Sequence, residues 1–166
     1  FSVFVPSMYF LHSIKQESVD FAIDEAFREA SFIQHYLREM PSDKNSFAEV
    51  CSALDRVYAD NSHRLTLIDR QGVVFYDSFQ KDVSTLENHR YHKEVTEALA
   101  DGRGRSIRQS VSVGIPFAYV AVRSDIPGWG QGVIRVAAPL SLVEEQAEAR
   151  ARALGAGAVA AFAVAM

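Results

Sequence analysis

The hydrophobic positions near the start of the chain recur at alternating steps of four and three residues. This spacing is typical of one apolar stripe along an α-helix and predicts a helix from about Tyr9 to Met40, ended by Pro41. Such a helix is about 45–50 Å long, at about 1.5 Å per residue. The stripe consists of Val19, Ile23, Ala26, Ala30, Ile33, Leu37 and Met40.

A second amphipathic helix is predicted after Pro41. Ser46 and Glu49 have the spacing of a capping box, and the apolar residues that follow, as far as Tyr58, fall on one helical face. From Arg64 the apolar period changes to two, which indicates strands. RLTLID, the turn DRQG and VVFYDS therefore predict a β-hairpin over residues 64–78.

The second half of the chain predicts a short helix and three more strands. YHKEVTEALA gives the helix over 91–100, and the strands cover 106–113, 117–124 and 132–139. Another helix begins at Leu140. The predicted fold class is α+β, with five mostly antiparallel strands in one sheet, a long N-terminal helix on one face and flanking helices.

Composition narrows the class of protein. The 166 residues are enough for one domain, and the net charge of −4 gives no electrostatic footprint for nucleic acid. The single cysteine, Cys51, excludes an internal disulfide and a cysteine-based zinc cluster.

Both ends of the sequence are apolar. It opens with FSVFVPSMYFL and closes with ALGAGAVAAFAVAM, and each stretch is shorter than the about 20 residues of a membrane span. We expect residues 1–14 to be a truncated membrane helix, 15–143 an extracytoplasmic domain, and 144–166 an exit helix with a second truncated membrane segment. The alternative for the C-terminal end is an ordinary buried helix.

A polar stretch, DSFQKDVSTLENHRYH, interrupts the chain at residues 77–92. His89 and His92 lie near three carboxylates but not at the i, i+4 spacing of a metalloprotease helix, so we expect a capped loop without a bound metal. The chain also lacks a Gly-x-Ser-x-Gly nucleophile elbow and a phosphate-binding loop. We therefore expect neither an enzyme nor a cofactor. The three carboxylates are Asp77, Asp82 and Glu87.

The hairpin and the polar stretch together resemble a known family. LTLIDRQGVVFYDS, then LENH and EVTEAL, then IRQSVSV, AYVAV and GVIRVAAPL resemble the extracytoplasmic sensor domain of PhoR-type membrane histidine kinases over about residues 64–143. The resemblance implies a PAS/Cache-like domain between two membrane helices, outside the inner membrane, that signals to a cytoplasmic kinase in a two-component system. A chemotaxis receptor, a cyclic-dinucleotide enzyme and a structural module that only pairs helices remain alternatives.

The resemblance implies a pocket between the sheet and the polar stretch. Tyr76, Ser78, His89, Arg108 and Tyr119 are the candidate lining residues, for a small anionic ligand. Arg108 is central because its planar guanidinium suits a carboxylate or a phosphate. One alternative is a structural salt bridge from Arg108 to Glu87 or Asp77, and another is that His89 acts as a pH sensor.

The apolar stripe of the long helix has a heptad spacing, which can pair a helix with its own copy. A homodimer is therefore expected through Val19, Ile23, Ala26, Ala30, Ile33 and Leu37. The alternative is that this stripe packs on the sheet of its own chain.

Overall fold

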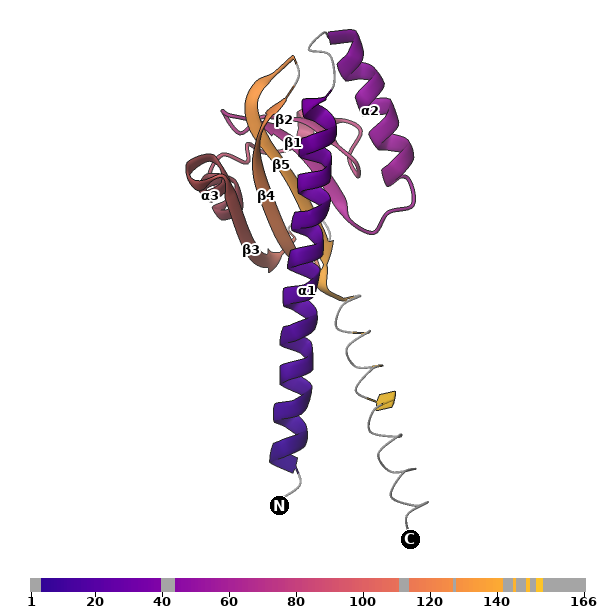
Figure 1. The fold of residues 1–166 in the computed structure, drawn as a ribbon, viewed down its shortest axis with the longest axis vertical. Helices are drawn as coiled ribbons and strands as arrows, with labels where there is room; N and C mark the ends of the chain where they lie inside the picture. Colours follow the sequence, from indigo (N-terminus) through magenta and orange to yellow (C-terminus); the bar gives the residue numbers. More distant parts are fainter. Residues whose placement is uncertain are drawn as a thin grey trace.

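Five antiparallel strands form a sheet with two helices on one face and a short helix with a long loop on the other (Figure 1). The computed structural model describes residues 4–39, 44–110, 114–126 and 128–141, and single residues at 145, 149, 152 and 153. The predicted α+β class is confirmed. The elements are α1 (Phe4–Arg38), α2 (Lys44–Tyr58), β1 (Arg64–Asp69), β2 (Val74–Asp77), the 3-10 helix η1 (Val83–Thr85), α3 (Lys93–Asp101), β3 (Arg103–Gln109), β4 (Pro116–Ile126) and β5 (Gly130–Pro139).

The strand order is β2-β1-β5-β4-β3, and every pair of neighbours is antiparallel. The last strand therefore lies in the middle of the sheet, between β1 and β4. Because side chains alternate between the two faces of a strand, the register decides which residues share a face. Thr66 lies opposite Arg135, and Ser106 lies opposite Tyr119.

The face toward α1 and α2 is apolar. Leu65 and Leu67 of β1, with Val120 of β4 and Val136 of β5, are buried in the main hydrophobic cluster together with residues of α1 and α2. α1 lies across β4 and β5, and its first half extends beyond the edge of the sheet (Figure 1).

The apolar stripe of α1 is part of this core, so the predicted dimer surface is wrong in its residues. Ala26, Ala30 and Leu37 are fully buried, Ile23 and Ile33 are nearly so, and Val19 packs against the same cluster. Alanine at the closest positions lets the helix approach the strands, and burial of the larger side chains stabilises the contact. These side chains are not available to a second copy.

The opposite face of the sheet carries α3 on a smaller cluster. Val95 and Ala98 of α3 pack against Ile68, Ala121 and Val133. Gly104 allows this close approach, because a Cβ at that position would overlap the backbone of α3 at Glu94.

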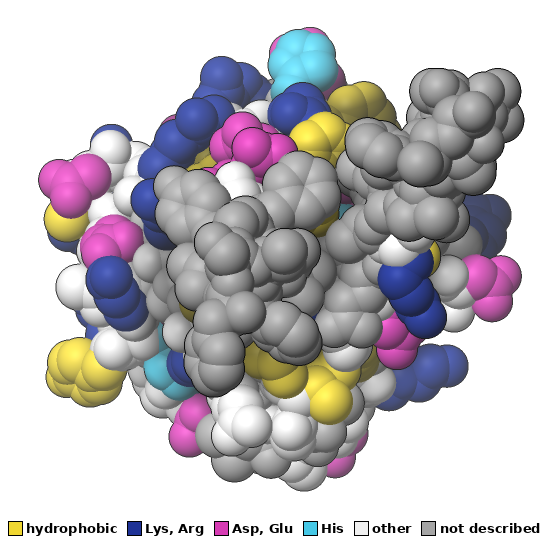
Figure 2. Space-filling view, turned by 90° about the horizontal axis from the view of Figure 1, so that it is seen from below, with side chains coloured by type: hydrophobic (Ala, Val, Ile, Leu, Met, Phe, Trp, Pro, Cys, Tyr) yellow, Lys and Arg dark blue, Asp and Glu magenta, His cyan; other side chains and the backbone are white. Residues whose placement is uncertain are grey.

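The surface of the described residues mixes charges of both signs. Seen from below, basic and acidic side chains interleave around the rim of the molecule (Figure 2). On α1, Phe21 and Phe32 are 60% and 68% exposed, on the side of the helix that does not face the sheet.

The predicted elements are confirmed with shifted ends. The predicted helix over 91–100 spans Lys93–Asp101, and the strand predicted over 106–113 begins at Arg103. Residues 111–113 of that strand, Met40 and most of 142–166 lie outside the described residues. Among the described residues, no helix is both long and apolar enough to cross a bilayer.

We predict that Ala30→Glu destabilises the fold, because the new carboxylate would be buried without a counter-ion. An unpaired buried charge lowers the free energy of unfolding by about 3–5 kcal/mol, which urea denaturation measures. Phe32→Glu, on the exposed side of the same helix, is the matched control and should change it by less than about 0.5 kcal/mol. Equal effects of the two substitutions would show that this stripe does not pack on the sheet.

Candidate functional site

The polar stretch at 77–92 crosses the α3 face of the sheet as a lid held by its own hydrogen bonds. At its start, the Asp77 carboxylate accepts bonds from the backbone N–H groups of Phe79 and Gln80, each at 3.0 Å. In its middle, Asp82 caps η1 by accepting a bond from the backbone N–H of Ser84. These bonds order a segment that contributes little to either core.

The far end of the lid is fastened to the β1–β2 turn. The backbone N–H of His89 donates to the carbonyl of Gly72 at 2.8 Å, and the Asn88 side chain donates to the carbonyl of Gln71 at 3.0 Å. Gly72 has φ +89°, and a Cβ there would overlap Asn88 and the backbone of Arg90. Only glycine meets both requirements.

A cavity of about 310 Å³ lies between this lid and the sheet. β1, β3, β4 and β5 each contribute one floor residue, and the lid supplies most of the wall. The lining residues are Arg64, Thr85, Leu86, Glu87, His89, His92, Arg108, Ser110, Tyr119 and Arg135.

A fully buried carboxylate, Glu94 in the first turn of α3, organises the floor of the cavity. Arg108 donates to both of its oxygens, at 2.6 and 2.9 Å, and the Ser106 hydroxyl donates to one of them at 2.6 Å. Burial by itself raises the pKa of Glu94, but these hydrogen bonds outweigh burial and lower the pKa to about 2.

The structural salt bridge considered for Arg108 therefore exists, but the expected partners were wrong. Its carboxylate is Glu94, and not Glu87 or Asp77. Asp77 instead pairs with Arg64, at 2.9 and 3.0 Å, and accepts a bond from the Thr66 hydroxyl.

Arg135 is the third guanidinium of the cavity, and its charge is the least compensated. Its side chain is 3% exposed, and its ion pair to Glu94 is 3.7 Å long, while Arg108 holds both oxygens of that carboxylate more closely. Its Nη2 donates to the Thr66 hydroxyl at 3.1 Å. Its Nε–H is buried and has no hydrogen-bond partner among the described residues. Burial lowers the pKa of Arg135 to about 10, so the group is still charged at neutral pH.

Two neighbouring imidazoles, tilted by 31° to each other, form the wall next to these arginines. The rings of His89 and His92 lie 4.5 Å apart. Arg108 and Arg135 approach Nδ1 of His92 at 3.2 and 3.4 Å, and because arginine can only donate, Nδ1 is the acceptor. Nε2 then carries the proton of the neutral ring and faces Glu87 at 3.3 Å.

This arrangement favours an anion over a metal ion. Glu87, His89 and His92 bring their ligand atoms within 4.8 Å of one another, which is the proximity that a metal site needs. However, arginine donors occupy the lone pair of His92 Nδ1, and the guanidiniums of Arg108 and Arg135 stand beside it. A cation would have to enter a positive field, whereas an anion would be attracted to it.

Three of the five candidate site residues, His89, Arg108 and Tyr119, meet in this cavity, and two do not. Tyr76 is opposite Leu67, so its side chain faces the other core, where its hydroxyl donates to Asp55 of α2 at 3.1 Å. Ser78 accepts a bond from the backbone N–H of Leu65 at 3.0 Å and serves as an anchor of the lid.

Sequence reasoning missed several residues of the site. The strongest overlooked signal is Arg135, the single charged residue in the otherwise apolar strand GVIRVAAP. A buried strand rarely contains an arginine without a partner or a function. The other residues missed as part of this site are Arg64, His92 and Glu94.

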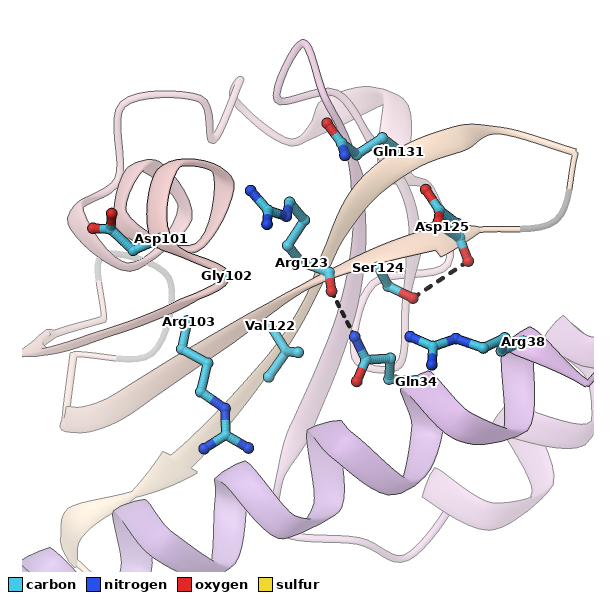
Figure 3. A pocket seen from close by; sticks show the side chains of 10 residues that line it. All are labelled: Gln34, Arg38, Asp101, Gly102, Arg103, Val122, Arg123, Ser124, Asp125 and Gln131. Atoms are coloured by element: carbon cyan, nitrogen blue, oxygen red, sulfur yellow. Dashed lines mark hydrogen bonds between the residues drawn. The ribbon is translucent and has the colours of Figure 1, made fainter.

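A second cavity, of about 480 Å³, lies between α1, β3 and β4 (Figure 3). Its side chains are spread around the rim, and several of them connect elements of the fold. The Gln34 amide donates to the carbonyl of Arg123 at 2.6 Å, and the Arg123 guanidinium donates to the carbonyl of Leu99 at the end of α3 at 3.0 Å. Although this cavity is larger, its polar groups are used to join helices to the sheet.

Comparison with known proteins identifies the fold. No protein-family model matches the sequence, and no curated protein does either. Among solved structures, the chain is similar to the ligand-binding domain of the Pseudomonas aeruginosa amino acid chemoreceptor PctC in complex with GABA. The TM-score is 0.61 at 12% identity, over 83% of this chain and 66% of that domain. The chain has a Cache-like fold.

The Cache-like domain is also similar to the sensor domain of the V. cholerae histidine kinase DctB, with a TM-score of 0.48 at 17% identity. That match covers 84% of this chain and 59% of the other. The chain thus spans less than two thirds of the length of either neighbour.

We predict that Glu94→Gln lowers the free energy of unfolding near pH 7 by about 3 kcal/mol, since the buried Arg135 and the half-buried Arg108 lose their carboxylate. Because folding depresses the pKa of Glu94 from 4.5 to about 2, its stabilisation is complete above about pH 4.5 and is lost as the pH falls towards 2. Urea denaturation from pH 7 downwards should show this decline in the wild type and a weaker one in the variant. Glu87→Gln, at an exposed carboxylate of the lid, is the control. Identical pH profiles for wild type and Glu94→Gln would contradict the prediction.

Proposed function

We propose that this chain is the extracytoplasmic sensory domain of a bacterial transmembrane receptor with a histidine kinase as its output unit. The resemblance over residues 64–143 and the Cache-like fold support this function. The apolar ends, 1–14 and 144–166, are proposed to continue into two membrane helices. The Cache-like domain would then face the periplasmic or extracellular side of the inner membrane, and it would act by binding rather than by catalysis.

The ligand is proposed to be a small anion bound in the cavity under the lid. The observation that carries this proposal is Arg135, a buried guanidinium whose Nε–H has no partner among the described residues and which lines the cavity. Unsatisfied buried donors are rare in folded proteins and are usually explained by a function. A cavity of about 310 Å³ is at the small end of ligand sites.

The other residues of the cavity suit the same ligand. Arg108 and Arg135 lie over the Tyr119 ring, with the Arg108 guanidinium carbon 4.0 Å from its centroid, so the ring holds both cations in position. Leu86 and the Tyr119 ring give the cavity an apolar part. A carboxylate with a short apolar tail would match both the guanidiniums and the apolar part of the cavity. The PctC domain, whose fold this chain shares, is in complex with GABA, a zwitterion that carries one carboxylate group.

We predict that Arg135→Met abolishes anion binding without unfolding the Cache-like domain, because Glu94 keeps its bonds to Arg108 and Ser106. Isothermal titration with acetate, pyruvate and GABA should give binding to the wild type and at least a tenfold weaker affinity for the variant. Arg103→Met, in the second cavity, is the matched control and should bind as the wild type does. Unchanged binding to Arg135→Met, with a normal thermal unfolding curve, would place the site elsewhere.

A homodimer is proposed to form through α1, by its outward side rather than by the buried stripe. Phe21 and Phe32 are exposed there, and Tyr36, one helical turn beyond Phe32, is exposed as well. Asp24 and Glu25 precede Arg28 by about one helical turn, so a parallel copy of the helix can place unlike charges opposite each other.

We predict that Phe32→Glu reduces cross-linked dimers of the full-length receptor in membranes several-fold, because the new charge would meet its own copy across the two-fold axis. Phe79→Glu, at an exposed aromatic residue of the lid, is the control and should leave the dimers unchanged. If Phe32→Glu cross-links as fully as the wild type, the outward side of α1 is not the dimer interface.

A further inference from the structure

His89 is a buried imidazole whose ring packs against the ring of His92. The residue is 5% exposed, and its backbone, rather than its ring, holds the lid to Gly72. Nδ1 of the ring is buried without a hydrogen-bond partner among the described residues, and the residue lines the cavity. Buried polar atoms of this kind call for a partner.

The groups that face His89 keep it neutral in the ligand-free domain. They come from every element around it: Arg135 from β5, Arg64 from β1, Glu94 from α3, and His92 from the same loop. Burial, and then the charges of Arg135, His92 and Arg64, lower the pKa of His89 to about 3, and only Glu94 acts in the opposite direction.

The arginines on the floor of the cavity share too few close carboxylates. Arg64 pairs with Asp77, whereas Arg108 and Arg135 share the single carboxylate of Glu94, and Glu87 on the lid is 71% exposed. A bound monoanion would supply the missing charge. It would also reverse the electrostatic penalty on a protonated His89, because an anion within a few ångströms favours the imidazolium form.

His89, and not His92, is the imidazole that can accept this proton at Nδ1. Nδ1 of His92 is occupied by the donors of Arg108 and Arg135, and its Nε2–H faces Glu87. Protonating Nδ1 of His92 would place an N–H against two guanidiniums. Nδ1 of His89 has no such donor in contact.

We propose that the cavity binds a small monocarboxylate together with one proton from solvent, which His89 takes up as the carboxylate docks against Arg135. This inference rests on the proposed anion site and adds its regulation. The one bond formed is N–H at Nδ1 of His89, with the proton taken from solvent: the free carboxylate and the neutral imidazole become a carboxylate–imidazolium pair. The receptor would therefore respond to the product of anion and proton concentrations, and binding would strengthen as the pH falls.

Calorimetry on the folded domain tests this coupling with pyruvate as the probe, because pyruvate stays ionised above about pH 5. Titrations in two buffers of different ionisation enthalpy give the number of protons taken up on binding. We expect uptake approaching one proton near pH 5, and an affinity that rises by up to tenfold per unit as the pH falls from about 7 to 5.

His89→Gln removes the proposed proton acceptor, and His35→Gln, at an exposed histidine of α1, is the control. His89→Gln should bind pyruvate with no proton uptake and no pH dependence, whereas His35→Gln should retain both. In the wild type, NMR titration of the histidine ring signals should show the pKa of His89 raised by saturating pyruvate, so the test does not depend on the variants folding normally. Binding without proton uptake would overturn this inference and leave the anion site standing, whereas no binding of pyruvate would count against both.

Discussion

The burial of one carboxylate organises the half of the molecule that faces the lid. Glu94 is fully enclosed between α3 and the sheet, where an ionised carboxylate is stable only with several donors. Arg108 and Ser106 supply them from β3, and Gly104 on the same strand lets α3 come close enough for these bonds. The contact fixes α3, and with it the end of the lid and the position of His92 just before the helix.

The two faces of the sheet have separate tasks because the strands alternate between them. Toward α1 and α2 the face is apolar and supplies most of the hydrophobic stabilisation. Toward the lid it carries Arg64, Arg135, Arg108 and Tyr119. On β4, Tyr119 lines the cavity while its neighbours Ala118 and Val120 belong to the core under α1. A ligand that contacts Tyr119 would thus lie one residue along β4 from side chains that pack under α1. This is the helix that the proposed sensor uses for its signal.

Much of the site depends on how charges that are distant in sequence meet. From the sequence, Arg108 is expected to pair with a carboxylate, and Glu87 and Asp77 are the obvious candidates because they stand in the polar stretch. The true partner, Glu94, looked like an ordinary surface residue of a short amphipathic helix. Glu94 is buried because α3 packs against β3. The hydrophobic pattern of α3 alone does not predict that contact. Tyr76 was assigned to the wrong face for a related reason: the register of β2 changes between Leu67 and Ile68 of its partner strand.

The sequence by itself determined the elements, their order, the α+β class and the position of the lid, because hydrophobic period and turn chemistry are local properties. It also singled out His89, Arg108 and Tyr119 as neighbours of that lid. Only the tertiary structure decided that the stripe of α1 packs on its own sheet and that Glu94 is shared by two arginines, Arg108 and Arg135. Both outcomes depend on which helix and sheet surfaces pack together. In the sequence alone, an apolar stripe or a charged side chain is equally compatible with several partners.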